Sequence, residues 1–237
     1  QTAEKDSTFM TVQFYAAAAA SLAKDSRLAI AALERAKNTP YRQYDVYQYL
    51  CYEYGEARTA QDSVMLEKTF EEGMQVFPDS AFFLNNLINT YIYSNRNEKA
   101  LEMLNVAIQK NPNDANLYNV MGRVYETGLK DYANAEKNFQ IALEKDPNLT
   151  DALSNIGRIY YNQGVNKLSE ANMINDSKKY QEELSMAKDL FKKALPYYKK
   201  AHEAEPEKMD NMIALRGIYY NLNMGPELEA IEAEMNK

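Results

Sequence analysis

The feature of the sequence that most restricts its fold is a regular spacing of prolines. Pro78 and Pro112 are 34 residues apart, and Pro147 follows Pro112 by 35 residues. Pro206 follows Pro147 by 59 residues, which is one further period of 34 with an insertion of 25. A period of about 20 to 50 residues is typical of proteins in which one small structural unit is stacked many times. We therefore expect repeats of about 34 residues.

Each repeat carries small and apolar residues at intervals of three and four, which place them on one face of an α-helix. The alternation that would indicate a strand is absent, so each repeat is predicted to form two helices. Small residues such as Gly122 and Gly157 are expected where two helix axes approach closely, with aromatic residues filling the space beside them. The recurring positions are Leu87, Ile88, Tyr91, Ala100, Leu104 and Ala107; Met121, Gly122, Tyr125, Ala135, Phe139 and Ala142; and Ile156, Gly157, Tyr160, Ala194, Tyr198 and Ala201.

This pattern, small-x-x-Tyr followed by Ala-x-x-x-aromatic-x-x-Ala and a closing Pro, resembles the tetratricopeptide repeat (TPR). The resemblance covers nearly the whole chain and is closest from Pro78 to Pro147. The family's tryptophan is absent, and its place is taken by Tyr47, Leu84, Tyr118 and Leu153. The resemblance implies an all-α fold, a right-handed α-solenoid of stacked helix-turn-helix repeats.

The repeats are expected to form one domain over residues 1–237, ended by a polar capping helix that starts near Pro226. The six expected repeats are 8–39, 40–77, 78–111, 112–146, 147–205 and 206–237.

The fifth repeat holds the insertion, near residues 164–188. A turn-prone cluster, NDSKK, divides it, and apolar residues continue at helical spacing from Leu184 to Ala201. We therefore predict a helical hairpin that extends the repeat rather than a disordered loop. Pro196 lies within the second helix, where it removes one backbone hydrogen bond, so we expect a kink there.

Composition and motifs exclude several kinds of function. The chain has 27 Lys and Arg against 34 Asp and Glu, a net charge of −7, which argues against binding to nucleic acid or to an acidic membrane surface. The single cysteine, Cys51, and the single histidine, His202, cannot form a zinc site together, and the glycines form no phosphate-binding loop. We expect no enzymatic activity, no cofactor, no metal and no membrane insertion.

The resemblance implies where a partner would bind. In the TPR family, one face of each first helix lines a concave groove that holds extended peptides. Asparagine amides there can pair with a peptide backbone, while Arg123 and Arg158 can fork onto a carboxylate. The lysines of the family's carboxylate clamp are absent, so that specificity is not expected. The positions implied are Gln48, Tyr52, Asn85, Asn89, Tyr93, Asn119, Arg123, Ser154, Arg158, Tyr161 and Asn162.

Two interpretations of function stay open at this point. One is a non-enzymatic scaffold that binds a protein or peptide in the groove; the other is a structural subunit that docks into a larger cell-envelope assembly through its convex face or its hairpin. The hairpin region is basic within an acidic chain, although lysines on a helix often do no more than face solvent. The hairpin residues considered for docking are Lys178, Lys179, Lys188 and Lys192.

The location of the protein is not read directly from its residues. Because the chain begins with Gln1, we expect that a segment before it has been removed. Residues 14–23 resemble the end of a secretory signal, but the charged residues before them favour an alanine-rich helix. The similarity to exported TPR proteins of bacteria favours a periplasmic location.

Overall fold

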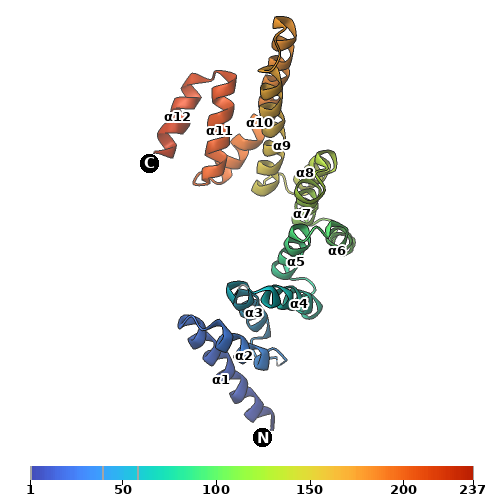
Figure 1. Ribbon diagram of the computed structural model, residues 1–237, viewed down its shortest axis with the longest axis vertical. Helices are drawn as coiled ribbons and strands as arrows, with labels where there is room; N and C mark the ends of the chain where they lie inside the picture. Colours follow the sequence, from blue (N-terminus) through green and yellow to red (C-terminus); the bar gives the residue numbers. More distant parts are fainter. Residues whose placement is uncertain (1, 39, 58, 237) are drawn as a thin grey trace. The chain divides into compact units, whose positions relative to one another are not determined.

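A computed structural model describes residues 2–38, 40–57 and 59–236, and this part of the chain is helical, without strands (Figure 1). The expected repeat ends at Thr39 and Lys237 lie outside the described residues. The elements are α1 Thr2–Leu22, α2 Ser26–Ala36, α3 Gln43–Ala57, α4 Ala60–Val76, α5 Ala81–Tyr93, α6 Asn97–Lys110, α7 Ala115–Arg123, the π-helix η1 Val124–Leu129, α8 Tyr132–Lys145, α9 Thr150–Ala171, α10 Ser177–Ala204, α11 Met209–Leu222 and α12 Gly225–Met235. The prediction of an all-α fold is confirmed.

Contacts within the chain divide it into two compact units, Gln1–Arg96 and Asn97–Lys237. The boundary lies between α5 and α6, inside the third expected repeat. The single domain of six repeats stays a prediction, and each unit is described by itself.

In the first unit, α1 to α3 enclose an apolar core around Phe14, Leu33 and Leu50, which are all buried. The start of α4 is fixed by a capping box, in which Thr59 and Asp62 exchange hydrogen bonds between side chain and backbone. Local sequence signals thus set the helix ends, and apolar burial holds the helices together.

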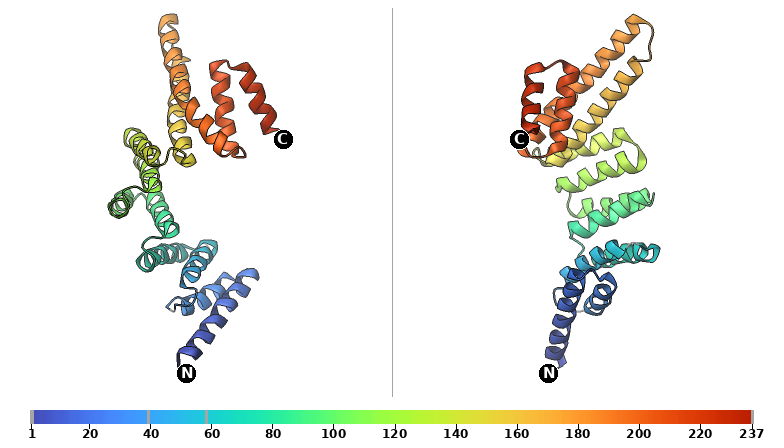
Figure 2. Two further views of the ribbon diagram at one scale, coloured as in Figure 1. Left: turned by 180° about the vertical axis from the view of Figure 1, so that it is seen from behind. Right: turned by 60° about the vertical axis from the view of Figure 1, so that its left-hand side comes forward.

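In the second unit, α9 and α10 form a long antiparallel hairpin, and α11 and α12 pack beside its base (Figure 2). Phe191, Tyr198, Leu215 and Ile218 are buried in the core that α10 shares with α11. The predicted hairpin is confirmed: only residues 172–176 separate its helices, and the Asp176 side chain caps α10 by accepting a hydrogen bond from the Lys179 amide.

Glycine makes close approach between the paired helices possible. A Cβ added to Gly122 would lie 2.5 Å from the Phe139 ring, and one added to Gly157 would lie 2.8 Å from the Tyr198 ring. Both distances are shorter than a van der Waals contact, so only glycine fits without a shift. The predicted arrangement of small residues beside aromatic ones is confirmed at these two positions.

The turn between the two helices of a repeat contains a residue in the left-handed region. Asn95, Lys130 and Asn223 have φ values of 58°, 57° and 55°. Asn95 and Asn223 each follow a repeat's first proline by 17 residues, but Lys130 follows Pro112 by 18. The π-helix η1 lies in that longer segment and accommodates the extra residue, because a π-turn takes up one residue more than an α-turn.

Pro196 lies inside α10, which is helical from Ser177 to Ala204. The C-terminal part of α10 leans away from the direction of its N-terminal part (Figure 2). A bend is the expected consequence of a missing amide donor and of the clash between the proline ring and the preceding turn.

Over the described ranges, no helix combines the length and the apolar character that crossing a bilayer requires.

Candidate partner-binding surfaces

Two of the groove positions of the second unit, Asn119 and Ser154, belong to a polar ladder that joins successive first helices. Asn155 Nδ2 of α9 donates to Asn119 Oδ1 of α7 over 2.9 Å, and both side chains are buried. Ser154 Oγ donates to Asn211 Oδ1 of α11, also over 2.9 Å. Asn119 was expected on an exposed face and is only 6% exposed. That expectation is wrong because α9 packs over Asn119, and Asn155 of α9 donates a hydrogen bond to the Asn119 side-chain oxygen.

Arg158 already holds a carboxylate of its own chain. Its Nε and Nη2 atoms donate to the two oxygens of Glu126 over 3.1 and 2.6 Å, and Nη2 also donates to Asn155 Oδ1 over 3.0 Å. Glu126 is buried and belongs to η1. The expectation that the Arg158 guanidinium binds a partner's carboxylate is therefore corrected, because its paired donors already bind the Glu126 carboxylate.

The other groove positions of the second unit differ in exposure. Asn162 is exposed and Arg123 is half-buried. Tyr161 is half-buried, and its ring meets the Phe191 ring edge-on at 5.6 Å. Arg123 and Asn162 therefore face solvent beside the ladder, while Tyr161 is mainly a packing residue.

In the first unit, the positions implied for the groove are accessible. Tyr52 of α3 is 58% exposed and Tyr93 of α5 is 87% exposed, while Gln48, Asn85 and Asn89 are half-buried. On α5, steps of four residues turn the helix by about 40° each, so Asn85, Asn89 and Tyr93 share one face. This unit thus presents amides and two exposed phenol rings.

Of the hairpin lysines, Lys178, Lys179 and Lys192 are exposed and Lys188 is half-buried. Lys192 pairs with Asp189 of its own helix at 2.9 Å. The hairpin turn also carries Met173, which is 84% exposed. These residues offer charge and some apolar surface, but no enclosed site.

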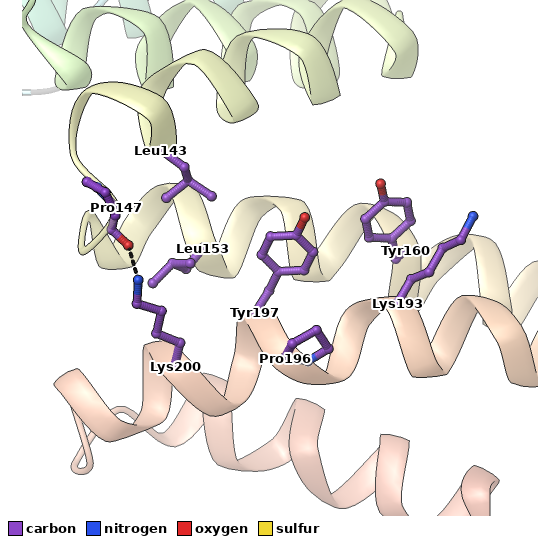
Figure 3. A pocket seen from close by; sticks show the side chains of 8 residues that line it. All are labelled: Leu143, Pro147, Leu153, Tyr160, Lys193, Pro196, Tyr197 and Lys200. Carbon is purple, nitrogen blue, oxygen red and sulfur yellow. Dashed lines mark hydrogen bonds between the residues drawn. The ribbon is translucent and has the colours of Figure 1, made fainter.

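An open pocket of about 600 Å³ lies where α8, α9 and the C-terminal half of α10 meet. Figure 3 shows that the Leu143, Leu153 and Tyr160 side chains converge on it from α8 and α9, and that Tyr197 reaches in from α10. On α9, Leu153 and Tyr160 are two turns apart and face away from the ladder residues Asn155 and Arg158. The pocket and the ladder therefore use opposite sides of α9.

Two lysines stand at the ends of the pocket. Lys193 Nζ lies 5.8 Å from the centre of the Tyr160 ring, within the range of a cation–π contact. Lys200 Nζ donates to the Pro147 carbonyl oxygen over 2.5 Å (Figure 3). Within the described part of the chain, neither lysine forms an ion pair. Volumes of about 300 to 1,000 Å³ with apolar walls and a few polar groups are typical of ligand sites.

Tyr160 is held in a fixed orientation. Its hydroxyl donates to Glu136 Oε1 over 2.5 Å, and its ring packs 6.0 Å from the Tyr197 ring. Burial and the hydrogen bond to Glu136 raise the pKa of Tyr160, so the hydroxyl stays protonated and keeps donating. Sequence reasoning missed this pocket, although Lys193, Pro196, Tyr197 and Lys200 share one helix face by their spacing.

The single cysteine and the single histidine both lie in contact with other parts of the fold. Cys51 is buried, and burial raises the pKa of its thiol to about 12, so the reactive thiolate is suppressed. His202 Nε2 lies 3.3 Å from a Glu234 carboxylate of α12. Among the residues that the structure describes, His, Cys, Asp and Glu side chains form no cluster of three that could hold a metal ion.

No protein-family model matches the sequence, and a search of curated proteins gives no match. Solved structures do match. A tetratricopeptide repeat protein from Parabacteroides merdae superposes with a TM-score of 0.56 at 14% identity, over 94% of this chain and 77% of that one. A MamA protein gives 0.52 at 18% identity, over 85% and 94% of the two chains.

MamA of Desulfovibrio magneticus, from residue 41 to its end, gives a TM-score of 0.51 at 14% identity, over 84% of this chain and 97% of that one. Sequence identities this low are evidence of a shared fold only. Together with the helix pairs and their glycine–aromatic packing, these similarities establish that the chain has the all-α helical repeat fold of tetratricopeptide proteins.

Proposed function

We propose that this protein is a non-enzymatic scaffold that binds a polypeptide along one face of the first helices of its second unit. The observation that carries the proposal is a row of positions on α7 and α9 that stays open to solvent. Arg123 and Arg158 occupy equivalent positions in this row, and each is exposed or half-buried. This row, with Asn162 one turn beyond Arg158, is called the first-helix row below.

The ladder beneath the row supports the proposal. Its hydrogen bonds fix the orientation of α7 against α9 without using the Asn162 side chain, and the Glu126–Arg158 pair holds the edge of the row in place. A surface that is ordered before binding loses less conformational entropy when a peptide docks. Side-chain amides and an arginine suit the backbone carbonyls and polar side chains of such a peptide.

Selection of phage-displayed random peptides on the purified chain tests the proposal. The double variant R123A/N162A removes two row side chains without touching the ladder hydrogen bonds described above. Its matched control is N148A/R216A, which removes one exposed asparagine and one exposed arginine elsewhere in the same unit. We expect selected peptides to lose affinity for R123A/N162A alone. Equal binding by both variants would contradict a role for the row.

The alternative, docking of the hairpin into a larger assembly, is favoured by the exposed Met173 at the hairpin turn and the exposed lysines beside it. A chain that lacks residues 165–186 separates the two proposals. If the hairpin docks, this deletion abolishes assembly with the native complex, whereas R123A/N162A leaves assembly unchanged.

A further inference from the structure

The pocket between α8, α9 and α10 has an apolar floor and a cation at each end, which is the chemistry of a site for an acidic segment with an apolar anchor. We propose that it binds a partner segment in which two acidic residues flank one large apolar or aromatic side chain. This site is separate from the first-helix row, and the proposal stands whether or not the row binds a peptide.

Charge complementarity supports this occupant. Residues 188–200 carry five lysines and one aspartate in a chain whose net charge is −7. The segment therefore carries a net charge of +4, and the two lysines that line the pocket form no ion pair within the described residues. Leucine side chains and tyrosine rings form the floor between the two lysines. This apolar floor favours the binding of an apolar side chain, which is removed from water when it docks.

The backbone spacing of the two lysines sets the least spacing of the acidic groups, because the two side chains point toward opposite ends of the pocket (Figure 3). Lys193 and Lys200 are seven residues apart on one helix, which is about 10 Å along the axis at 1.5 Å per residue. An extended peptide covers about 10 Å in three residues. The proposed segment therefore has acidic residues at positions i and i+3, with the apolar anchor at i+1 or i+2.

A polypeptide fits the pocket better than a lipid does. A lipid has one anionic end, so its chain would lie against the second ammonium group. A peptide with two acidic side chains can instead place a carboxylate beside each ammonium group.

The test uses fluorescence anisotropy with a labelled peptide that contains Glu-Ala-Phe-Glu between Gly-Ser flanks. Two matched peptides replace both glutamates by glutamine, or the phenylalanine by serine. We expect each change to weaken binding to the wild-type chain by about tenfold or more, since it removes either both ion pairs or the buried ring. Raising NaCl from about 50 to 300 mM should weaken binding of the parent peptide as screening increases.

The chain offers a matched pair of lysine variants. K193E/K200E reverses the two pocket lysines, and K192E/K199E reverses their exposed neighbours on the same helix with the same change in net charge. We expect K193E/K200E to weaken binding by about tenfold or more, and K192E/K199E by less than about threefold. Circular dichroism checks folding, and K193Q/K200Q replaces the reversed pair if K193E/K200E is unfolded.

Three results would overturn the proposal. One is equal loss of binding in K193E/K200E and K192E/K199E, which would indicate general charge attraction. Another is equal affinity for the parent peptide and for the peptide in which serine replaces phenylalanine. The third is binding to phosphatidylglycerol vesicles, lost in K193E/K200E, without binding to the peptide, which would assign the pocket to a lipid. Loss of peptide binding in R123A/N162A would instead place the peptide on the first-helix row.

Discussion

Replacing Gly122 by alanine tests the close approach of paired helices. In an exposed helix, this change stabilises by about 0.8–1.0 kcal/mol, because alanine loses less backbone entropy than glycine. Here the new methyl would lie 2.5 Å from Phe139 Cε1 and 2.6 Å from Cδ1, and the Phe139 ring is fully buried. Such overpacking costs about 1–3 kcal/mol. We therefore expect a net loss of up to about 2 kcal/mol in the free energy of unfolding.

Urea unfolding followed by circular dichroism measures the effect, with G55A as the control. Gly55 lies in α3, is exposed, and would have no atom within 4 Å of an added Cβ, so G55A should stabilise by up to about 1 kcal/mol. The cost of G122A should shrink in an F139L background, because a smaller side chain leaves room for the methyl. If G122A stabilises as much as G55A, with no coupling to F139L, the packing described for α7 and α8 is wrong.

Three further predictions concern a carboxyl group, a thiol and a proline. Hydrogen bonds from Arg27 and Thr59 lower the pKa of Asp62 to about 2, so its contribution to stability is present above the unfolded value of about 4 and is lost as pH falls toward 2. Thermal midpoints between pH 7 and 2 should fall less steeply in D62N than in wild type, and parallel profiles would contradict this. Cys51 should resist a thiol reagent such as DTNB in the native chain and react as urea unfolds the first unit, whereas rapid native labelling would refute its burial. P196A should raise the free energy of unfolding by up to about 3 kcal/mol by restoring a helical hydrogen bond, and an unchanged urea midpoint would show that the bend in α10 has another cause.

Much of the fold follows from short-range patterns. Intervals of three and four residues determine which faces of a helix are apolar, and a glycine beside an aromatic residue indicates a close helix contact, as at Gly122 and Phe139. The hairpin was predictable because the apolar spacing continues through the insertion and Asp176 is a favoured N-cap residue.

The candidate sites were less predictable because they depend on contacts between helices. The Glu126–Arg158 pair involves η1, where one extra residue changes the helical register, and an ideal helical wheel omits that change. Asn119 is polar in the sequence, yet α9 packs over it, and Asn155 of α9 donates the hydrogen bond that satisfies its buried side-chain oxygen.

The pocket needed side chains from three helices to be placed together. Lysines occur in two adjacent pairs, at residues 192–193 and 199–200, and only Lys193 and Lys200 line the pocket. The sequence alone does not show which lysine of each pair faces α8 and α9.

Site-specific photo-crosslinking is the most direct test of the central claim that a polypeptide binds along the first-helix row. A benzophenone side chain is placed either at Asn162, an exposed row position, or at Glu144, an exposed position on α8 outside the row, and each chain is irradiated with a peptide selected for binding. The proposal predicts a peptide adduct at position 162 and little at position 144. Equal adduct yields at the two positions, or an adduct at position 144 alone, would contradict it.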